Sequence, residues 1–201
     1  ALVLQGGGAL GGYQCGVYQA LHETGIAPNW IAGISIGAIN AAILAGNAPD
    51  ERLAQLRAFW DTISEPAGPL ALPAVAIRAM VAGLPEHDGL LSWARNMSAL
   101  GAMLHGQRGF FEARALSPFL FSDGSDAATS FYDTAPLRET LARFVDFERI
   151  NRDRSVRLTV GATNVVRGNF RYFDSALEPI RVEHILASGA LPPAFPAVEI
   201  D

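Results

Sequence analysis

Residues 29–45, NWIAGISIGAINAAILA, begin with an apolar run short enough for a buried strand. From Ile36 to Ala45 the segment is apolar at almost every position, which is typical of a helix in the protein interior. Between the two, Gly33, Ser35 and Gly37 complete a G-x-S-x-G pattern. A serine at such a turn has a strained backbone and presents its hydroxyl at the start of the helix. The pattern predicts Ser35 as a nucleophile with two small supporting neighbours; the alternative is an ordinary strand-to-helix turn.

A second glycine-rich segment, Gln5 to Gly12 (QGGGALGG), follows a short apolar strand that opens the chain. A helix is expected after it, at Gly11 to Thr24. Consecutive glycines let backbone N–H groups point into one small volume without side-chain obstruction, which is the requirement for an oxyanion hole. The segment therefore predicts that Gly6, Gly7 and Gly8 hold a developing oxyanion.

The same glycines have a competing interpretation as a nucleotide site. Gly6, Gly8 and Gly11 match the dinucleotide pattern G-x-G-x-x-G, which requires an acidic residue about 20 positions further on. No Asp or Glu occurs between Glu23 and Asp50, and the chain has no lysine for a phosphate-binding loop. Nucleotide binding is therefore the weaker hypothesis.

Strands and helices alternate at a spacing that predicts an α/β fold with a mostly parallel sheet covered on both faces. The middle of the chain is either core or oligomer contact, or a lipid-facing cap in which Trp93, Phe110 and Phe111 line an acyl channel. The other expected elements are a helix at Pro49–Ile63, a helical insertion or cap at 66–129, a helix at Pro136–Val145 capped by Thr134, strands at Ser155–Thr163 and Asn169–Phe173, and a short helix at Arg181–Ser188.

Length and composition predict one domain over residues 1–201. The chain stops at Asp201 with no visible closing element, so we expect this domain to be incomplete at its C-terminus. Hydrophobic residues make up 50% of the chain and charged residues 17%, enough apolar surface for a substantial core. The net charge of -5 argues against nucleic acid as a partner. A single cysteine, Cys15, and four scattered histidines predict no disulfide, metal or cofactor. We expect a cytoplasmic protein with peripheral membrane contact, and the oligomeric state stays open.

Three blocks of sequence, taken together, resemble the patatin-like phospholipase family of bacterial-type serine acyl hydrolases. They are QGGGALGG at residues 5–12, GISIGAIN at 33–40 and ASGALPPAFPAVEID at 187–201, and they occur in the family's order. The resemblance implies a three-layer α/β/α sandwich and a Ser-Asp dyad that cleaves lipid esters without a metal. In this chain it assigns Ser35 as nucleophile.

Two positions depart from the family pattern. Leu10 occupies a position of the glycine loop that is often basic in the family. The family's catalytic Asp lies in an Asp-Gly-Gly or Asp-Gly-Ala motif soon after the ALPPxFP block, but this chain ends at Asp201 without that motif. We therefore expect the general base just beyond residue 201.

Other polar residues allow alternatives. His184 and Asp174 would complete an ordinary Ser-His-Asp triad, although a half-exposed helix histidine and a strand-ending aspartate that organises a turn are the simpler interpretations. Asn40, in an apolar helix, needs a hydrogen-bond partner and is expected to hold the glycine loop. The alternative functions are a carboxylesterase or lipase on neutral esters, a non-catalytic lipid-binding protein of the same fold and, third, a nucleotide-binding oxidoreductase.

Overall fold

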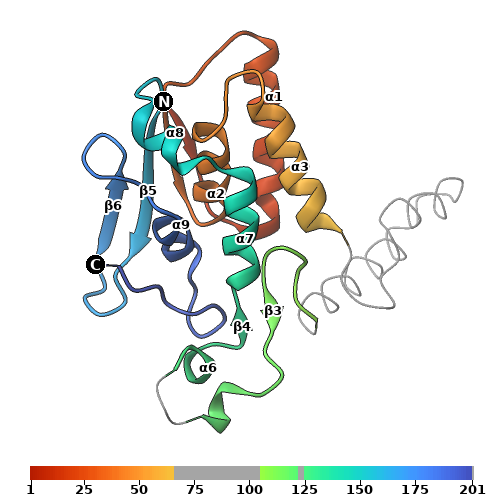
Figure 1. Ribbon diagram of the computed structural model, residues 1–201, viewed down its shortest axis with the longest axis vertical. Coiled ribbons are helices and arrows are strands. Elements are labelled where there is room, and N and C mark those ends of the chain that lie inside the picture. Colours follow the sequence, from red (N-terminus) through yellow and green to blue (C-terminus); the bar gives the residue numbers. More distant parts are fainter. Residues whose placement is uncertain (66–104, 122–124, 201) are drawn as a thin grey trace, which may run out of the picture.

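The central sheet of the computed structural model has four strands in the order β1-β2-β5-β6 (Figure 1). The structure describes residues 1–65, 105–121 and 125–200. Strands β1 (Leu2–Leu4), β2 (Trp30–Ile34) and β5 (Arg157–Thr163) are parallel, and β6 (Phe170–Asp174) is antiparallel to β5. The prediction of an α/β fold with a mostly parallel sheet is therefore confirmed.

The register of the sheet brings the two glycine-containing turns together. Leu4, the last residue of β1, is paired with Gly33, and Ile34, the last residue of β2, is paired with Gly161. Because parallel strands end at the same edge, the segments that follow β1 and β2 leave the sheet side by side. This edge positions the candidate site.

Helix α2 (Ile36–Ala45) is the centre of the core, as its apolar sequence predicts. All of its residues are buried, and it packs against β1, β2 and β5. Figure 1 shows α2 in the middle of the molecule, with α1 and α3 on one side and β5 and β6 on the other. The helices that surround it are α1 (Gly12–Glu23), α3 (Arg52–Ser64), α7 (Ala135–Phe144), α8 (Phe147–Arg152) and α9 (Val182–Gly189).

One face of the sheet is covered by these helices. Gly33 lies against Gly37 of α2, and Phe173 stacks on His184 of α9, so both helices pack on the same face. The expected helix layer on the opposite face has no member among the described residues. The large apolar side chains on that face are exposed in this part of the structure: Val3, Trp30, Ile34, Phe170 and Tyr172.

The region from 66 to 129 is only partly described. Residues 66–104 and 122–124, and with them Trp93, lie outside the described residues. The described remainder contains more than the expected helix. It has β3 (Glu112–Ala113), a 3-10 turn at Pro118–Leu120 and a short α6 (Asp126–Thr129), and β3 pairs with β4 (Tyr132–Asp133), which follows α6 in the chain. Rings of Phe110 and Phe111 pack against Phe195.

Two local expectations need correction. Thr134 is the N-cap residue of α7, but its side chain makes no cap hydrogen bond; instead the carboxylate of Asp133 accepts one from the Ala135 N–H at 2.8 Å. Helix α8 was not predicted, since it is short; its N-cap is Asp146, whose side chain accepts from the Arg149 N–H. The remaining predicted helices and strands are present within a few residues of their expected bounds.

Candidate active site

Ser35 forms a strained turn between β2 and α2. Its φ of 56° and ψ of -127° make it the one non-glycine residue with positive φ in the described part of the chain. A side chain at Gly33 would place its Cβ 2.3 Å from the Gly37 oxygen, and one at Gly37 would lie 2.1 Å from the Leu4 oxygen. Real Cβ atoms are not found at such distances, so both neighbours must be glycine. The predicted strain and the predicted smallness of the neighbours are confirmed.

The position of Ser35 at the start of α2 orients its main chain. Its carbonyl oxygen accepts hydrogen bonds from the N–H groups of Ala38 and Ile39, at 2.9 and 3.2 Å. The side chain is half-buried, and its Oγ makes no hydrogen bond with any described residue. The hydroxyl therefore stands at the positive end of the helix dipole, a position that favours developing negative charge.

The glycine loop lies against this serine. A Cβ on Gly6 would be 3.1 Å from the Ser35 Cβ, so the backbone of Gly6 lies next to the serine side chain with little room for a side chain between them. Gly7 has φ 147° and Gly8 φ 55°, conformations that favour glycine. Within the described residues, the N–H groups of Gly6 and Gly7 donate no hydrogen bond. Leu10, at the position that is often basic in the family, is 77% exposed.

Asn40 connects α2 to both ends of the glycine loop. Its side chain is fully buried, and its Nδ2 donates to the Gly11 carbonyl at 3.1 Å and to Gln14 Oε1 at 2.8 Å. Gln14 Nε2 donates in turn to the Gln5 carbonyl at 2.7 Å. Trp60 Nε1 donates to Asn40 Oδ1 at 3.1 Å. Asn40 thus bonds directly to Gly11 after Gly6–Gly8 and reaches Gln5, before them, through Gln14.

Ser188 of α9 also reaches the serine turn, and the sequence analysis missed it. Its Oγ accepts a hydrogen bond from the Ser35 N–H at 2.8 Å and donates one to the Gly161 carbonyl at 2.6 Å. The available signal was its place in the ASGALPPAFP block. Gln14 and Trp60 were missed as well, and no sequence pattern distinguished them.

The alternative Ser-His-Asp triad is not formed. His184 is 1% exposed rather than half-exposed, because its ring stacks on Phe173 with ring centroids 4.1 Å apart. Its Nδ1 accepts from the Arg181 N–H, and its Nε2 has no hydrogen-bond partner among the described residues. Burial lowers the pKa of His184, so the ring stays neutral and structural at neutral pH.

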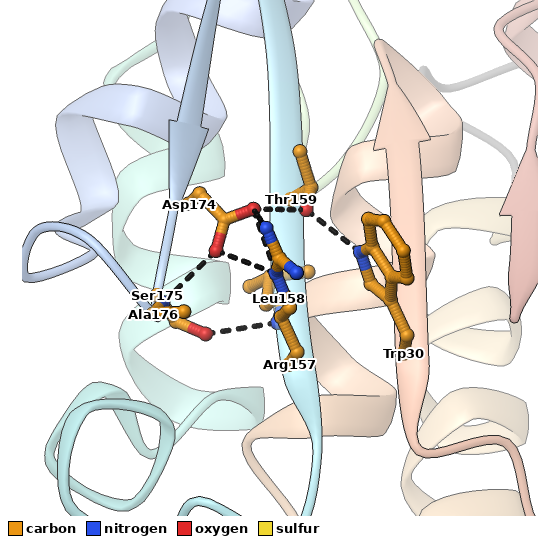
Figure 2. Close-up of polar contacts among 7 residues, drawn as sticks. All are labelled: Trp30, Arg157, Leu158, Thr159, Asp174, Ser175 and Ala176. Carbon is orange, nitrogen blue, oxygen red and sulfur yellow. Dashed lines mark hydrogen bonds and ion pairs between the residues drawn. The ribbon is translucent and has the colours of Figure 1, made fainter.

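Asp174 is committed to a polar network on the sheet (Figure 2). Arg157 Nε donates to both carboxylate oxygens at 2.9 Å, and Thr159 donates to Oδ2 at 2.8 Å. Thr159 accepts in turn from Trp30 Nε1 at 2.9 Å. Burial opposes ionisation, but the hydrogen bonds from Arg157 and its neighbours outweigh it and lower the pKa of Asp174. Its Oδ1 also accepts from the Ala176 N–H, which confirms that Asp174 ends the strand and organises the next turn.

An apolar groove of about 360 Å³ lies beside the glycine loop, between the edge strand β1 and α1. Its walls include Leu2, Leu4, Gly6, Leu10 and Tyr13. In the described part of the chain, no group of three or more His, Cys, Asp or Glu side chains is placed to hold a metal ion. The helices of that part are all too short or too polar to cross a bilayer.

A serine at a tight strand-to-helix turn, with a glycine-rich loop against it, has the geometry of a nucleophile elbow. The chain belongs to the patatin-like phospholipase family, whose model matches residues 2–201. The resemblance inferred from the three sequence blocks is therefore confirmed.

Individual relatives match only parts of longer proteins. A stretch of 59 residues is 46% identical to "Triacylglycerol lipase ptl3" of Schizosaccharomyces pombe, over 29% of this chain and 12% of that protein. Two solved structures are also similar. The type III effector protein ExoU aligns over 94% of this chain and 38% of its own, at 21% identity and a TM-score of 0.37. VipD from Legionella pneumophila aligns over 96% and 43%, at 14% identity and a TM-score of 0.40. The chain thus spans less than half of each relative.

Proposed function

We propose that this protein is a serine acyl hydrolase that cleaves carboxylic esters of lipids, with Ser35 as its nucleophile. The observation that carries the proposal is the positive φ of Ser35, held beside the backbone of Gly6. Strain of this kind persists only where the surrounding structure over-determines it, and it gathers at active sites. Membership of the patatin-like phospholipase family supports the hydrolysis of lipid esters.

The proposed reaction has two halves. Ser35 Oγ attacks the ester carbonyl carbon, and its proton passes to the carboxylate of the Asp that completes the family's Ser-Asp dyad. The N–H groups of Gly6, Gly7 and Gly8 donate hydrogen bonds to the oxyanion that forms. Collapse of this intermediate breaks the bond to the alcohol, which leaves with the proton from the Asp. Water then attacks the acyl-enzyme, again with the Asp as base, and releases the fatty acid.

The supporting residues have separate roles in this proposal. Gly33 and Gly37 permit the close contacts of the serine turn, and Asn40 holds the ends of the glycine loop. The free N–H groups of Gly6 and Gly7 are available to an oxyanion because no described residue accepts from them. A lost oxyanion donor typically lowers the rate about 10²–10³-fold.

Two substrate classes are compatible with these residues. The family description favours phospholipids, through a phospholipase A or lysophospholipase activity. Neutral glycerol esters are the second class, because the 59-residue match is to a protein named a triacylglycerol lipase. The apolar groove beside Gly6 is consistent with either, since both substrates carry acyl chains.

The decisive experiment is labelling of the full-length protein with a fluorophosphonate, which forms an Oγ–phosphorus bond and releases fluoride. Mass spectrometry should locate one label at Ser35 in the wild-type protein and none on Ser35→Ala. The control variant Ser175→Ala, at a serine that directly follows β6, should be labelled at Ser35 like the wild-type protein. Hydrolysis of phosphatidylcholine vesicles and of triacylglycerol emulsions then ranks the substrate classes. A folded wild-type protein that takes no label would refute the hydrolase and favour a non-catalytic lipid-binding protein.

A further inference from the structure

The hydroxyl of Ser188 occupies the point at which β2 and β5 separate. The last paired residues of the two strands are Ile34 and Gly161. One residue later the chain leaves the sheet at Ser35, and its N–H can no longer follow the ladder. The Ser188 hydroxyl stands between this N–H, at 2.8 Å, and the Gly161 carbonyl, at 2.6 Å. The side-chain hydroxyl thus takes the place of the main-chain hydrogen bond that would continue the pairing of β2 with β5.

The polarity of this bridge is fixed by its partners. The Ser35 N–H can only donate, so the Ser188 oxygen accepts from it; the Gly161 carbonyl can only accept, so it receives the hydroxyl proton. With that proton committed, the hydroxyl has none to give to the Ser35 Oγ or to a substrate. This excludes proton transfer as the role of Ser188 in the arrangement seen.

We propose that Ser188 is a positioning residue, which holds the main chain of Ser35 in its strained conformation and so aims Oγ at the ester. The proposal rests on the hydrolase function proposed above. The carbonyl of Ser35 is anchored by the N–H groups of Ala38 and Ile39, which are backbone groups within α2. Its N–H donates, among the described residues, to the Ser188 side chain alone. Of the hydrogen bonds that the described residues make with the Ser35 main chain, the one to Ser188 is thus the one that a side-chain substitution removes.

The helix that carries Ser188 is itself firmly placed. Ser188 is 8% exposed, and it follows His184 by four residues, so the two side chains share one face of α9. The His184 ring is stacked on Phe173 of β6 on that face. The position of the hydroxyl is thus set by packing of α9 on the sheet, independently of the glycine loop.

The test compares Ser188→Ala with Ser175→Ala in the full-length protein. Ser175 is the matched control, because its Oγ also accepts from a main-chain N–H of the sheet, that of Leu158 at 2.9 Å, but it lies at the other end of β5. We expect the rate of fluorophosphonate labelling at Ser35 to fall roughly 10²-fold in Ser188→Ala, the scale of effect that follows a misplaced reacting group. Ser175→Ala should keep the wild-type rate.

Three further readouts separate positioning from a general loss of structure. The turnover number for an ester should fall in Ser188→Ala while KM stays near the wild-type value. The pH dependence of labelling should keep its shape, since Ser188 transfers no proton. Ser188→Thr retains the hydroxyl and should keep most of the wild-type labelling rate. Ser188→Val has the shape of threonine without the hydroxyl and should not. This last pair also serves if Ser188→Ala fails to fold.

Equal labelling rates in Ser188→Ala and Ser175→Ala, or in Ser188→Thr and Ser188→Val, would overturn the positioning role and leave the hydrolase proposal intact. Absence of any label on the folded wild-type protein would overturn both proposals together. A shifted pH profile in Ser188→Ala would assign the hydroxyl a part in proton transfer instead.

Discussion

Replacing Asn40 by alanine removes a hydrogen-bonding hub from the interior of α2. The side chain is fully buried, and three partners depend on it: the Gly11 carbonyl, Gln14 Oε1 and Trp60 Nε1. Two of these bonds lead to the glycine loop, through Gly11 directly and through Gln14 to Gln5. The substitution should therefore lower stability and loosen the loop at the same time.

The size of both effects follows from these contacts. Three neutral hydrogen bonds at about 1 kcal/mol each predict a loss of about 3 kcal/mol in the free energy of unfolding. Domains of this kind have about 5–15 kcal/mol, so the variant should stay folded with a urea midpoint about 1 M lower. If the loop shifts enough to remove one oxyanion donor from Ser35, the labelling rate should fall about 10²-fold or more.

Asn151→Ala is a matched control for this prediction. Asn151 is also an amide side chain that fixes main chain, since it donates to the Ile180 carbonyl at 2.9 Å and accepts from the Ile180 N–H at 2.8 Å. It lies in α8 and bonds to the segment just before α9, so its loss should reduce stability by about 2 kcal/mol and leave labelling unchanged. Urea unfolding and the rate of fluorophosphonate labelling measure the two effects. Equal labelling rates in Asn40→Ala and Asn151→Ala would show that Asn40 serves stability alone.

Two further predictions concern stability. Gly37→Ala should lower the free energy of unfolding by about 1–3 kcal/mol or more, because its methyl group would lie 2.1 Å from a carbonyl oxygen. Gly16→Ala should raise this free energy by about 0.5–1 kcal/mol, because Gly16 lies in helix α1 and a Cβ there would have no atom within 4 Å. Equal thermal stability of the two variants would contradict this. Burial lowers the pKa of His184 in the folded protein below its value of about 6.5 in the unfolded chain. The contribution of neutral His184 to the free energy of unfolding is therefore complete above pH about 6.5 and is lost as the pH falls through the folded-state pKa. Urea unfolding from pH about 7.5 to 5 should lose stability more steeply in the wild-type protein than in His184→Asn, and parallel curves would refute it.

The parts of this structure that could be predicted from sequence are those fixed by local chemistry. Helix α2 has the predicted bounds because its apolar composition allows only an interior helix there. The strained turn at Ser35 follows from the glycines on either side, whose missing side chains are required by contacts of 2.1–2.3 Å. A strand, a tight turn and a helix follow one another within 17 residues, so few other local structures are possible and the sequence alone predicts them.

The unpredicted contacts join residues far apart in the chain. Ser188 bonds to Ser35 across 153 positions, and Trp60 bonds to Asn40 across 20. His184 was expected to be half-exposed because its helix is short and polar at its start, but stacking on Phe173 buries it. These outcomes depend on which elements become neighbours, and strand order and helix packing decide that rather than any local pattern.

Helix α2 is the element that both halves of the candidate site share. Ser35 precedes its first turn, Gly37 in that turn touches the Leu4 carbonyl at the end of β1, and Asn40 bonds to Gly11 at the end of the glycine loop. A small displacement of α2 would therefore carry the serine and the loop together, and their separation would change little. This accounts for an asparagine in an otherwise apolar helix: a leucine at position 40 would fill the space, but the Gly11 carbonyl and the Trp60 N–H would each lose the hydrogen bond that Asn40 makes with them. The distance between the Ser35 hydroxyl and the N–H groups of the glycine loop is thus set by Gly37 and Asn40 of α2, rather than by its large apolar residues.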